Sequence, residues 1–388
     1  MGKAELPSGW KSTKLGEIGH FNKGKGISND DKGSGNIPCL SYGEIYTTHN
    51  EYIKEFHSFI SAEVAQNSYQ MKKGDLLFTC SGETKEEIGK CVAFIDDFRA
   101  YAGGDIIIIS PTNEINSIFM GFLLNTYYVV KQKASYGQGD SVVHISIGSI
   151  ERIIIYLPPL SEQKAIAEIL TTADKLIVVK ERLITAKQKQ KQWLMQNLLT
   201  GKRRLSGFSG EWERIKMGNI TDIDVGQSPD TTDIGYYPFI NAGTTPSGYL
   251  SIYNTEPDTI TTPSRGQGGI GFVSYQAGRF WCGPLSYRIR SKNKDLFIRY
   301  LYYWLSNSIE HIIGMAHMSG LPALNKKELI DFYISSPPLP EQQAIANILT
   351  TADREIELLK KELEQHKQIK KYLMQKLLTG KIRVKGAG

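Results

Sequence analysis

The sequence predicts an α+β protein with a pseudo-twofold internal repeat, in which two mixed α/β globular domains are joined by two long antiparallel helices that form a coiled coil. Three observations predict this fold. One segment of 48 residues occurs twice, both copies have helical periodicity, and the stretches around them mix short apolar runs with Gly-rich loops.

The repeat is the strongest of these signals. Residues 158–205 align without a gap with residues 337–384, at a constant offset of 179, and 25 of the 48 positions are identical. The chain before each copy also opens alike, because Trp10 and Leu15-Gly16-x-Ile18 return as Trp212 and Met217-Gly218-x-Ile220. A duplication explains this pattern. The predicted order is a first domain (1–156), a helical region (157–206), a second domain (207–336) and a second helical region (337–388).

Each repeated segment is predicted to be one helix. Ser161 is a suitable N-cap, and Glu162 and Glu341 suit the positive end of the helix dipole. Gly201 and Gly380 are natural stops. A helix of about 38 residues is roughly 57 Å long.

The apolar residues of both helices recur by four and three, which is typical of a coiled-coil seam. One helix with one apolar stripe needs a partner, and the second copy, running antiparallel to the first, is the expected one. The alternative is that each helix packs only on its own domain. The first copy places Lys180, Lys187 and Lys191 in the same register. The expected helix-pair interface consists of Ile166, Leu170, Ile177, Ile184, Leu194, Leu198, Ile345, Leu349, Ile356, Leu359, Leu363, Leu373 and Leu377.

The domains themselves are predicted to contain short strands and one longer helix each. In the first domain we expect strands near 75–79, 91–95, 105–109 and 151–156, and a helix near 115–131. In the second we expect strands near 259–262, 270–274 and 285–290, and a helix near 296–313.

Composition and charge indicate a soluble protein. The net charge is +6, and the two repeated segments carry +6 and +3 of it, so the remaining chain is at −3. Any contact of the globular domains with nucleic acid must therefore come from local patches. The four cysteines are scattered without C-x-x-C spacing, and no apolar run is long enough to span a bilayer. A cytoplasmic location is expected.

Motifs for covalent chemistry are weak. Asp75 with Glu83 and Lys85 imitates the spacing of metal-dependent nucleases, but the second domain has no matching carboxylate pair. Ser336-Pro337-Pro338-Leu339 differs at both ends from the tetrad of amino-methyltransferases, its counterpart is Leu157-Pro158-Pro159-Leu160, and a helix entry explains both copies better. The chain also lacks a phosphate-binding glycine loop and His spacing typical of a metal site. We therefore predict no catalytic residue and no metal ligand.

Polar loops flanked by glycine are the best candidates for a binding site. One such loop follows a predicted strand in each domain (81–85 and 264–269), and another precedes the last strand of each (136–141 and 317–321). Arg and Gln side chains read guanine and adenine edges, lysines bind phosphate, and glycine permits a close backbone approach. Polar glycine loops are also often only loops. The candidate DNA-binding residues are Lys23, Lys25, Thr84, Lys85, Gln138, Ser141, His144, Gln227, Arg265, Gln267, Tyr275 and His317.

The repeated motifs resemble those of a known family. Pro-Pro-Leu-x-Glu-Gln, Ile-Leu-Thr-Thr-Ala-Asp and Leu-Met-Gln-x-Leu-Leu-Thr-Gly-Lys occur twice, and each unit begins with Trp-x4-[Leu/Met]-Gly-x-Ile. They are similar to the conserved regions of specificity subunits of type I restriction-modification enzymes. The resemblance covers nearly the whole chain, with two target recognition domains and two conserved helical regions in the family's order.

The resemblance implies a non-catalytic subunit that binds double-stranded DNA. Each recognition domain would read one half of a split, asymmetric site, and the helices would set the unread spacer. Two modification subunits with S-adenosylmethionine would methylate adenine, and restriction subunits with ATP and Mg²⁺ would cleave unmodified DNA. We expect no cofactor in this chain itself, and self-association when it is alone. The alternatives are a coiled-coil scaffold without sequence-specific DNA reading, and a stand-alone nuclease or methyltransferase.

Overall fold

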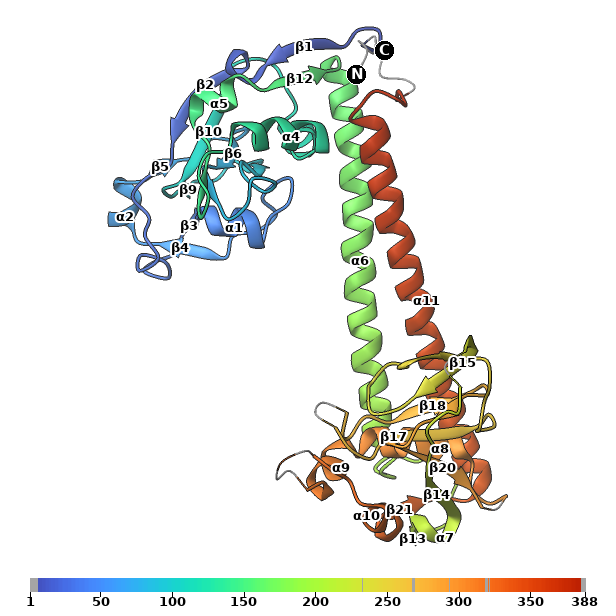
Figure 1. Ribbon diagram of the computed structural model, residues 1–388. Coiled ribbons are helices and arrows are strands. Elements are labelled where there is room, and N and C mark those ends of the chain that lie inside the picture. Colours follow the sequence, from blue (N-terminus) through green and yellow to red (C-terminus); the bar gives the residue numbers. More distant parts are fainter. Residues whose placement is uncertain are drawn as a thin grey trace. The chain divides into compact units, whose positions relative to one another are not determined.

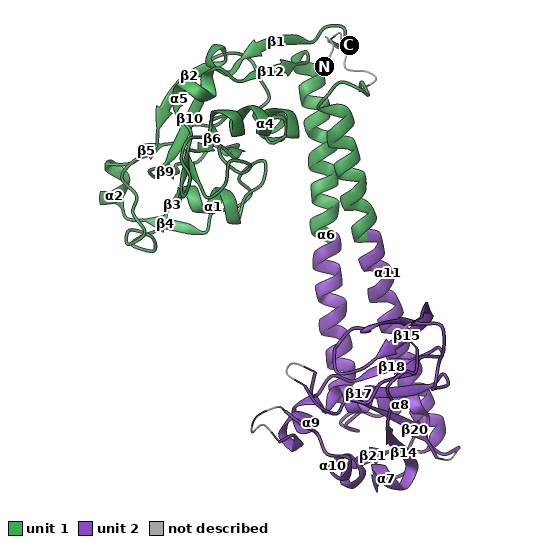
Figure 2. Ribbon diagram, viewed as in Figure 1, with its two compact units in different colours: residues 1–179, 363–388 green, residues 180–362 purple. Residues whose placement is uncertain are grey.

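The computed structural model describes residues 6–231, 233–266, 269–292, 294–317, 320 and 322–384. The chain forms two compact units (Figure 2). Unit 1 contains residues 1–179 and 363–388, and unit 2 contains residues 180–362. We call the globular part before the first long helix domain 1, and the globular part between the two long helices domain 2. The four segments expected from the sequence divide the chain differently from these two units, and their boundaries stay a prediction.

Domain 1 combines an antiparallel sheet of order β2-β10-β6-β8 with a mixed sheet of order β4-β3-β9-β5 and two small strand pairs, β1-β12 and β7-β11. Its elements are β1 (Lys11–Lys14), η1 (Leu15–Glu17), β2 (Gly19–Lys23), β3 (Ile37–Leu40), α1 (Tyr42–Thr47), β4 (Ser58–Ile60), α2 (Ala62–Gln66), β5 (Tyr69–Gln70), β6 (Leu76–Thr79), β7 (Ser81–Gly82), β8 (Cys91–Ala93), β9 (Tyr101–Ala102), β10 (Ile106–Pro111), α3 (Ser117–Leu124), α4 (Tyr127–Tyr136), β11 (Val143–His144), α5 (Ile147–Glu151) and β12 (Ile154–Leu157).

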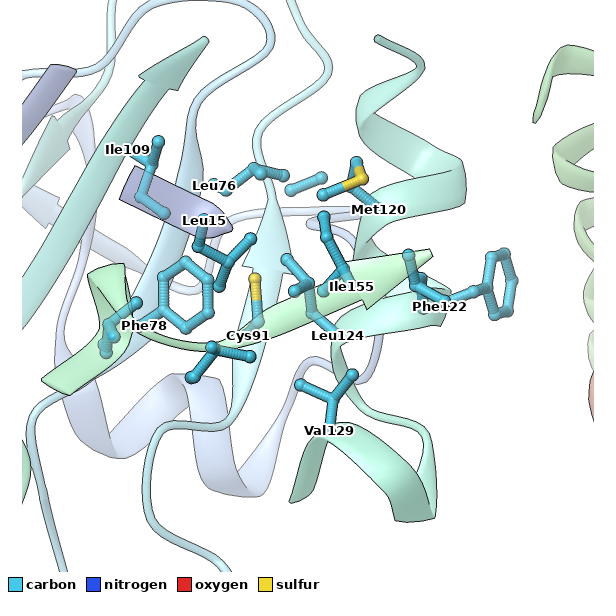
Figure 3. Close-up of a cluster of buried hydrophobic side chains, with 14 of the residues drawn as sticks. Leu15, Leu76, Phe78, Cys91, Ile109, Met120, Phe122, Leu124, Val129 and Ile155 are labelled. Atoms are coloured by element: carbon cyan, nitrogen blue, oxygen red, sulfur yellow. The ribbon is translucent and has the colours of Figure 1, made fainter. Parts of the chain in front are cut away.

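The main core of domain 1 lies between the first sheet and helix α3. Phe78 and Ile109 extend from the sheet, and Met120 and Leu124 from α3, into one buried cluster (Figure 3). The alternate residues of β10, such as Ile108, belong to a second cluster on the other face of the sheet. The uninterrupted isoleucine run of β10 follows from this, because a strand buried on both faces has no polar side.

Domain 2 repeats this plan. Its first sheet has the order β14-β20-β17-β18, beside a second sheet of order β16-β15-β19 and the strand pair β13-β21. Its elements are β13 (Glu213–Lys216), α7 (Met217–Ile220), β14 (Thr221–Val225), β15 (Ile234–Ile240), β16 (Gly248–Leu250), β17 (Thr259–Pro263), β18 (Ser274–Gln276), β19 (Trp281–Cys282), β20 (Ser286–Ser291), α8 (Ile298–Asn307), α9 (Ile309–Met315), α10 (Lys326–Asp331) and β21 (Tyr333–Ser336).

Two helices of 39 residues, α6 (Leu160–Leu198) and α11 (Leu339–Leu377), run antiparallel, and each unit holds one end of both (Figure 1). Ion pairs fix their register. In unit 2, Lys187 lies 2.7 Å from Glu355 and Lys191 lies 2.5 Å from Asp353. In unit 1, Lys370 lies 2.7 Å from Asp174. Since Lys370 and Asp174 are the repeat counterparts of Lys191 and Asp353, the pairing obeys the predicted pseudo-twofold symmetry, and the predicted fold class is confirmed.

The positions expected at the helix pair are all buried or half-buried. In unit 1, Ile166 and Leu170 of α6 share the core of domain 1 with Leu373 and Leu377 of α11. The alternative in which each helix packs only on its own domain is therefore wrong. Each helix end contacts both its domain and the other helix. The lysines that interrupt the seam of α6 do not disrupt it, because acidic residues of α11 face them.

Three secondary-structure predictions need correction. The helices expected at 115–131 and 296–313 are each broken in two, into α3 and α4 and into α8 and α9. The first break occurs because the Asn125 side chain bonds to the backbone of a neighbouring strand. The strand expected at 270–274 begins only at Ser274, since Gly271 has a φ of +87° and Phe272 closes a turn on Gly269.

Candidate nucleic-acid interface

In domain 1 the two predicted polar loops lie side by side. Gln138 and His144 close the second loop by donating their N–H groups to each other's carbonyl oxygens, at 2.9 and 2.8 Å. Strand β11, which ends this loop, pairs with β7, which begins the first loop. The Ser81 hydroxyl also lies 3.0 Å from Nδ1 of His144. The backbone therefore holds two loops that are 55 residues apart in sequence as one surface.

A third segment, the turn after β2, borders this surface. Lys25 N–H donates to the Ala102 carbonyl at 3.3 Å, and Cys80 N–H donates to the Asp105 carbonyl at 2.9 Å. Residues 102–105 thus link the turn that carries Lys25 to the start of the first loop. Burial raises the pKa of the Cys80 thiol, and the charge of Lys23 opposes this rise.

Domain 2 builds the same arrangement from different residues. His317 and Ala323 exchange backbone hydrogen bonds of 2.9 and 3.0 Å, and Arg265 forms a β-bridge to Ala323. Gln227 N–H donates to the Cys282 carbonyl at 2.9 Å, as Lys25 does to Ala102. Lys25 and Gln227, predicted independently, therefore occupy equivalent turns.

The accessibility of the candidate residues fits a contact surface. Within the described ranges, all of them are exposed except Tyr275, which is half-buried. Tyr275 is separate from the loops, because its hydroxyl bonds to Asp258 and its ring packs under Arg299 at 4.3 Å. Gln267 lies outside the described residues. His317 Nε2 lies 3.2 Å from Glu328, so this ring is already engaged within the domain.

The charges at the two surfaces differ. Domain 1 presents Lys23, Lys25 and Lys85, and carboxylates of the loop segment Glu83–Glu87 lie among them. Domain 2 presents Arg265 and Gln227, together with His317 and the neighbouring Glu328 carboxylate. Both sets can donate hydrogen bonds to phosphates and can form hydrogen bonds with base edges, as DNA reading requires.

The residues of the nuclease-like spacing do not form a site. Asp75 is buried, and its carboxylate accepts hydrogen bonds from Lys72 N–H (2.8 Å) and the Ser110 hydroxyl (2.7 Å). Burial raises the pKa of Asp75. Glu83 and Lys85 lie on the exposed loop. Among the described residues, no group of three or more His, Cys, Asp or Glu side chains is arranged to hold a metal ion, and no helix there is long and apolar enough to cross a membrane.

Sequence reasoning missed two ion pairs that join the helices. Arg383 binds both carboxylate oxygens of the buried Glu162, at 2.6 and 2.7 Å. Its counterpart Arg204 binds both oxygens of the buried Glu341, at 2.6 Å each. The arginine and the glutamate are both identical between the two copies of the repeat, and this identity is the feature of the sequence that could have indicated the pairs. Glu162 and Glu341, which were expected to interact with the positive end of the helix dipole, thus each also bind the arginine that follows the other helix.

Comparison with known proteins agrees with this geometry. Residues 7–187 and 209–368 match the family described as type I restriction modification DNA specificity domain. A putative type I restriction enzyme MjaX specificity subunit of Methanocaldococcus jannaschii is 28% identical, over 98% of this chain and 95% of the relative. The MjaVIII specificity subunit of the same organism is 25% identical, over 98% and 94%.

Solved structures share the fold. The S subunit of a type I restriction-modification system from M. genitalium has a TM-score of 0.67 at 17% identity, covering 96% of this chain and 97% of that one. The HsdS subunit of Thermoanaerobacter tengcongensis has a TM-score of 0.54 at 20% identity, covering 98% and 99%. With both halves of the chain matched, this protein belongs to the type I restriction-modification DNA specificity family.

Proposed function

We propose that this chain selects the DNA target of a type I restriction-modification complex and performs no chemistry itself. Domain 1 reads one half of a split, asymmetric site and domain 2 reads the other. The observation that carries the proposal is the twice-built loop surface. The same backbone hydrogen bonds hold Gln138 to His144 and His317 to Ala323, while the side chains on the two surfaces differ. One frame with two sets of exposed polar residues suits two different half-sites.

The partners in this proposal are two modification subunits, which carry S-adenosylmethionine and methylate adenine, and restriction subunits, which use ATP and Mg²⁺. Two partner copies suit the helices, because equivalent apolar side chains are exposed on both. Trp193 is 46% exposed and its repeat counterpart Tyr372 is 51% exposed. Val179 and its counterpart Leu358 are exposed as well. Large exposed aromatics are typical anchors of protein interfaces, and without partners they favour self-association.

Adenine-methylation mapping tests the function. Cells that express the chain with its modification subunits should methylate one split motif, and cells that lack this chain should not. Methylation that is unchanged without the chain would contradict the proposal. Methylation at unrelated sequences would instead favour a scaffold that does not read DNA.

The helix pair should set the spacer, and a paired deletion tests this role. Residues 178–184 of α6 face residues 358–364 of α11, as the 2.5 Å pair between Lys180 and Glu362 indicates. Removing both segments shortens the pair by about 10 Å, which corresponds to about three base pairs. We expect a shorter spacer with both half-sites unchanged. An unchanged spacer would contradict the role of the helices.

A further inference from the structure

The segment Ser81–Gly89, which contains the first polar loop of domain 1, is held at both ends by side chains from outside the loop. At its start, the Tyr46 hydroxyl donates to the Ser81 carbonyl at 3.0 Å and accepts from the Thr79 hydroxyl at 2.7 Å. At its end, Lys133 Nζ donates to the Gly89 carbonyl at 2.5 Å and to the Leu124 carbonyl at 3.0 Å. The loop is therefore attached to helices α1 and α4 as well as to the sheet.

Lys133 is an unusual residue for this position. It is only 1% exposed, and within the described chain its ammonium group has no carboxylate partner. Burying an ammonium group is costly, and an apolar side chain of similar length would fill the same space. What an apolar side chain would not provide is the pair of hydrogen bonds to Gly89 and Leu124. We take the hydrogen bond to the loop end as the reason for the lysine.

Asn125 extends the attachment. It lies at the break between α3 and α4, where its Oδ1 accepts from Cys91 N–H at 3.0 Å and its Nδ2 donates to the Cys91 carbonyl at 2.7 Å. Lys133 and Asn125 together fix the stretch from Gly89 to Cys91, where the loop re-enters the sheet. Gly89 itself has a φ of +71°, and a Cβ there would lie 2.9 Å from Lys133 Cδ. The fit at the loop end is therefore tight.

The middle of the loop lacks such support. A cavity of about 850 Å³ lies beneath it, lined by Tyr46, Glu83, Glu87, Lys133 and other residues. Residues 83–87 are exposed, and the buried Ile88 packs into the domain core only next to the loop end, so the conformation of the middle depends on the two ends. Preorganised supporting residues determine how accurately a binding site is held.

We propose that Tyr46, Asn125 and Lys133 are positioning residues that set the DNA specificity of domain 1 without contacting DNA. This proposal rests on the proposed function, since it concerns the loop expected to read one half-site. The three side chains fix where the loop leaves the sheet and where it returns. They thereby fix the direction in which Thr84 points toward the bases and the position at which Lys85 meets a phosphate.

Among the described residues of domain 2, no buried lysine ends the corresponding loop. This loop ends at Gly271, also with positive φ, but a Cβ there would meet the aliphatic side chains of Ile313 and Ile309. The lysine thus acts on one domain only. Its replacement should affect one half-site and leave the other unchanged.

The experiment uses this chain in complex with its modification subunits. Lys133→Met keeps the length of the side chain and removes its donors, and Lys131→Met on the exposed face of the same helix is the matched control. Methylation rates are measured on DNA with single base changes at every position of the site. We expect discrimination in one half-site to fall about 10-fold or more, given what one bidentate base contact contributes. Discrimination in the other half-site, and the control variant, should remain at the wild-type level.

Tyr46→Phe is the second variant, because it removes only a hydroxyl group and is therefore compatible with folding. It should lower discrimination severalfold in the same half-site as Lys133→Met. Unchanged discrimination in a folded Lys133→Met complex and in Tyr46→Phe would overturn the proposal. Equal losses in both half-sites would overturn it as well, since they would indicate a general loss of structure. A wild-type complex that methylates no split site would instead refute the proposed function itself.

Discussion

In domain 1 the first loop ends on a buried ammonium group, whereas in domain 2 the equivalent loop ends on aliphatic side chains. The junctions with the helices differ in the same way. Lys370 binds two nearly buried carboxylates, Glu51 and Asp174, but its repeat counterpart Lys191 binds Asp353, which also accepts the Tyr303 hydroxyl. The aromatic contact is common to both, since Lys370 lies over Phe122 and Lys191 over Tyr303. The duplicated frame thus tolerates different chemistry at equivalent points, although at the first junction one oxygen of Glu51 and one of Asp174 stay buried without a hydrogen-bond partner.

The largest difference between the two units is expected in the unfolding free energy that these two lysines contribute at the junctions with the helices. Lys370→Met removes the ammonium group that the buried Glu51 and Asp174 share and leaves Lys54 at 3.9 Å from Asp174. It should cost about 3–5 kcal/mol of unfolding free energy. Lys191→Met should cost about 1 kcal/mol or less, because Asp353 is more than one third exposed. Denaturant unfolding of both variants measures the difference. Equal losses would show that the two junctions are energetically alike.

The second largest effect is expected in the pH dependence of stability, which should reveal the buried Lys133 of domain 1. Burial lowers the pKa of Lys133 to about 8, whereas the pKa of this lysine in the unfolded chain is about 10.4. Between these values the unfolded chain binds more protons, so a rise in pH stabilises the fold. The gain across this window is roughly 3 kcal/mol.

The measurement is the difference in unfolding free energy between the wild type and Lys133→Met, followed from about pH 7 to about pH 10. Subtraction removes the contributions of other titrating groups. The difference should grow in favour of the wild type as the pH rises. A constant difference would mean that Lys133 titrates alike in both states.

Substitution of the exposed aromatic residues of the two helices tests whether the chain has two equivalent binding sites for modification subunits. Trp193→Ala and Tyr372→Ala should each weaken binding of one modification subunit by about 1–2 kcal/mol. Titration calorimetry with the chain and its modification subunit should then show one weakened and one intact site for either variant. A variant that weakens both sites equally, or neither, would argue against two equivalent docking faces.

The smallest effect is expected at a single phosphate contact. Lys85→Ala should lower the affinity for all DNA sequences alike, by about 1 kcal/mol, and should reduce the salt slope of binding by about one. Binding measured at several salt concentrations checks both values. A loss confined to the cognate sequence would mean that Lys85 reads a base.

The repeat explains why so much of the fold was predictable from the sequence. Periodicity and the identical positions of the two copies indicated α6, α11 and their antiparallel pairing. Loops 81–85 and 136–141 were predicted separately, but their pairing was not, because strand pairing between distant segments has no local signature. The helix break at Asn125 and the burial of Lys133 were missed for a related reason. Both depend on tertiary hydrogen bonds, and a lysine at a helical position ordinarily indicates an exposed face.

The central claim is that each domain reads its own half-site through its own loops. Methylation-motif mapping of two variant complexes tests it most directly, with Gln138→Ala in domain 1 and Arg265→Ala in domain 2. We predict relaxed specificity in one half of the motif for the first variant and in the other half for the second, with the spacer unchanged in both. Relaxation in the same half for both variants, or in neither half, would contradict the claim.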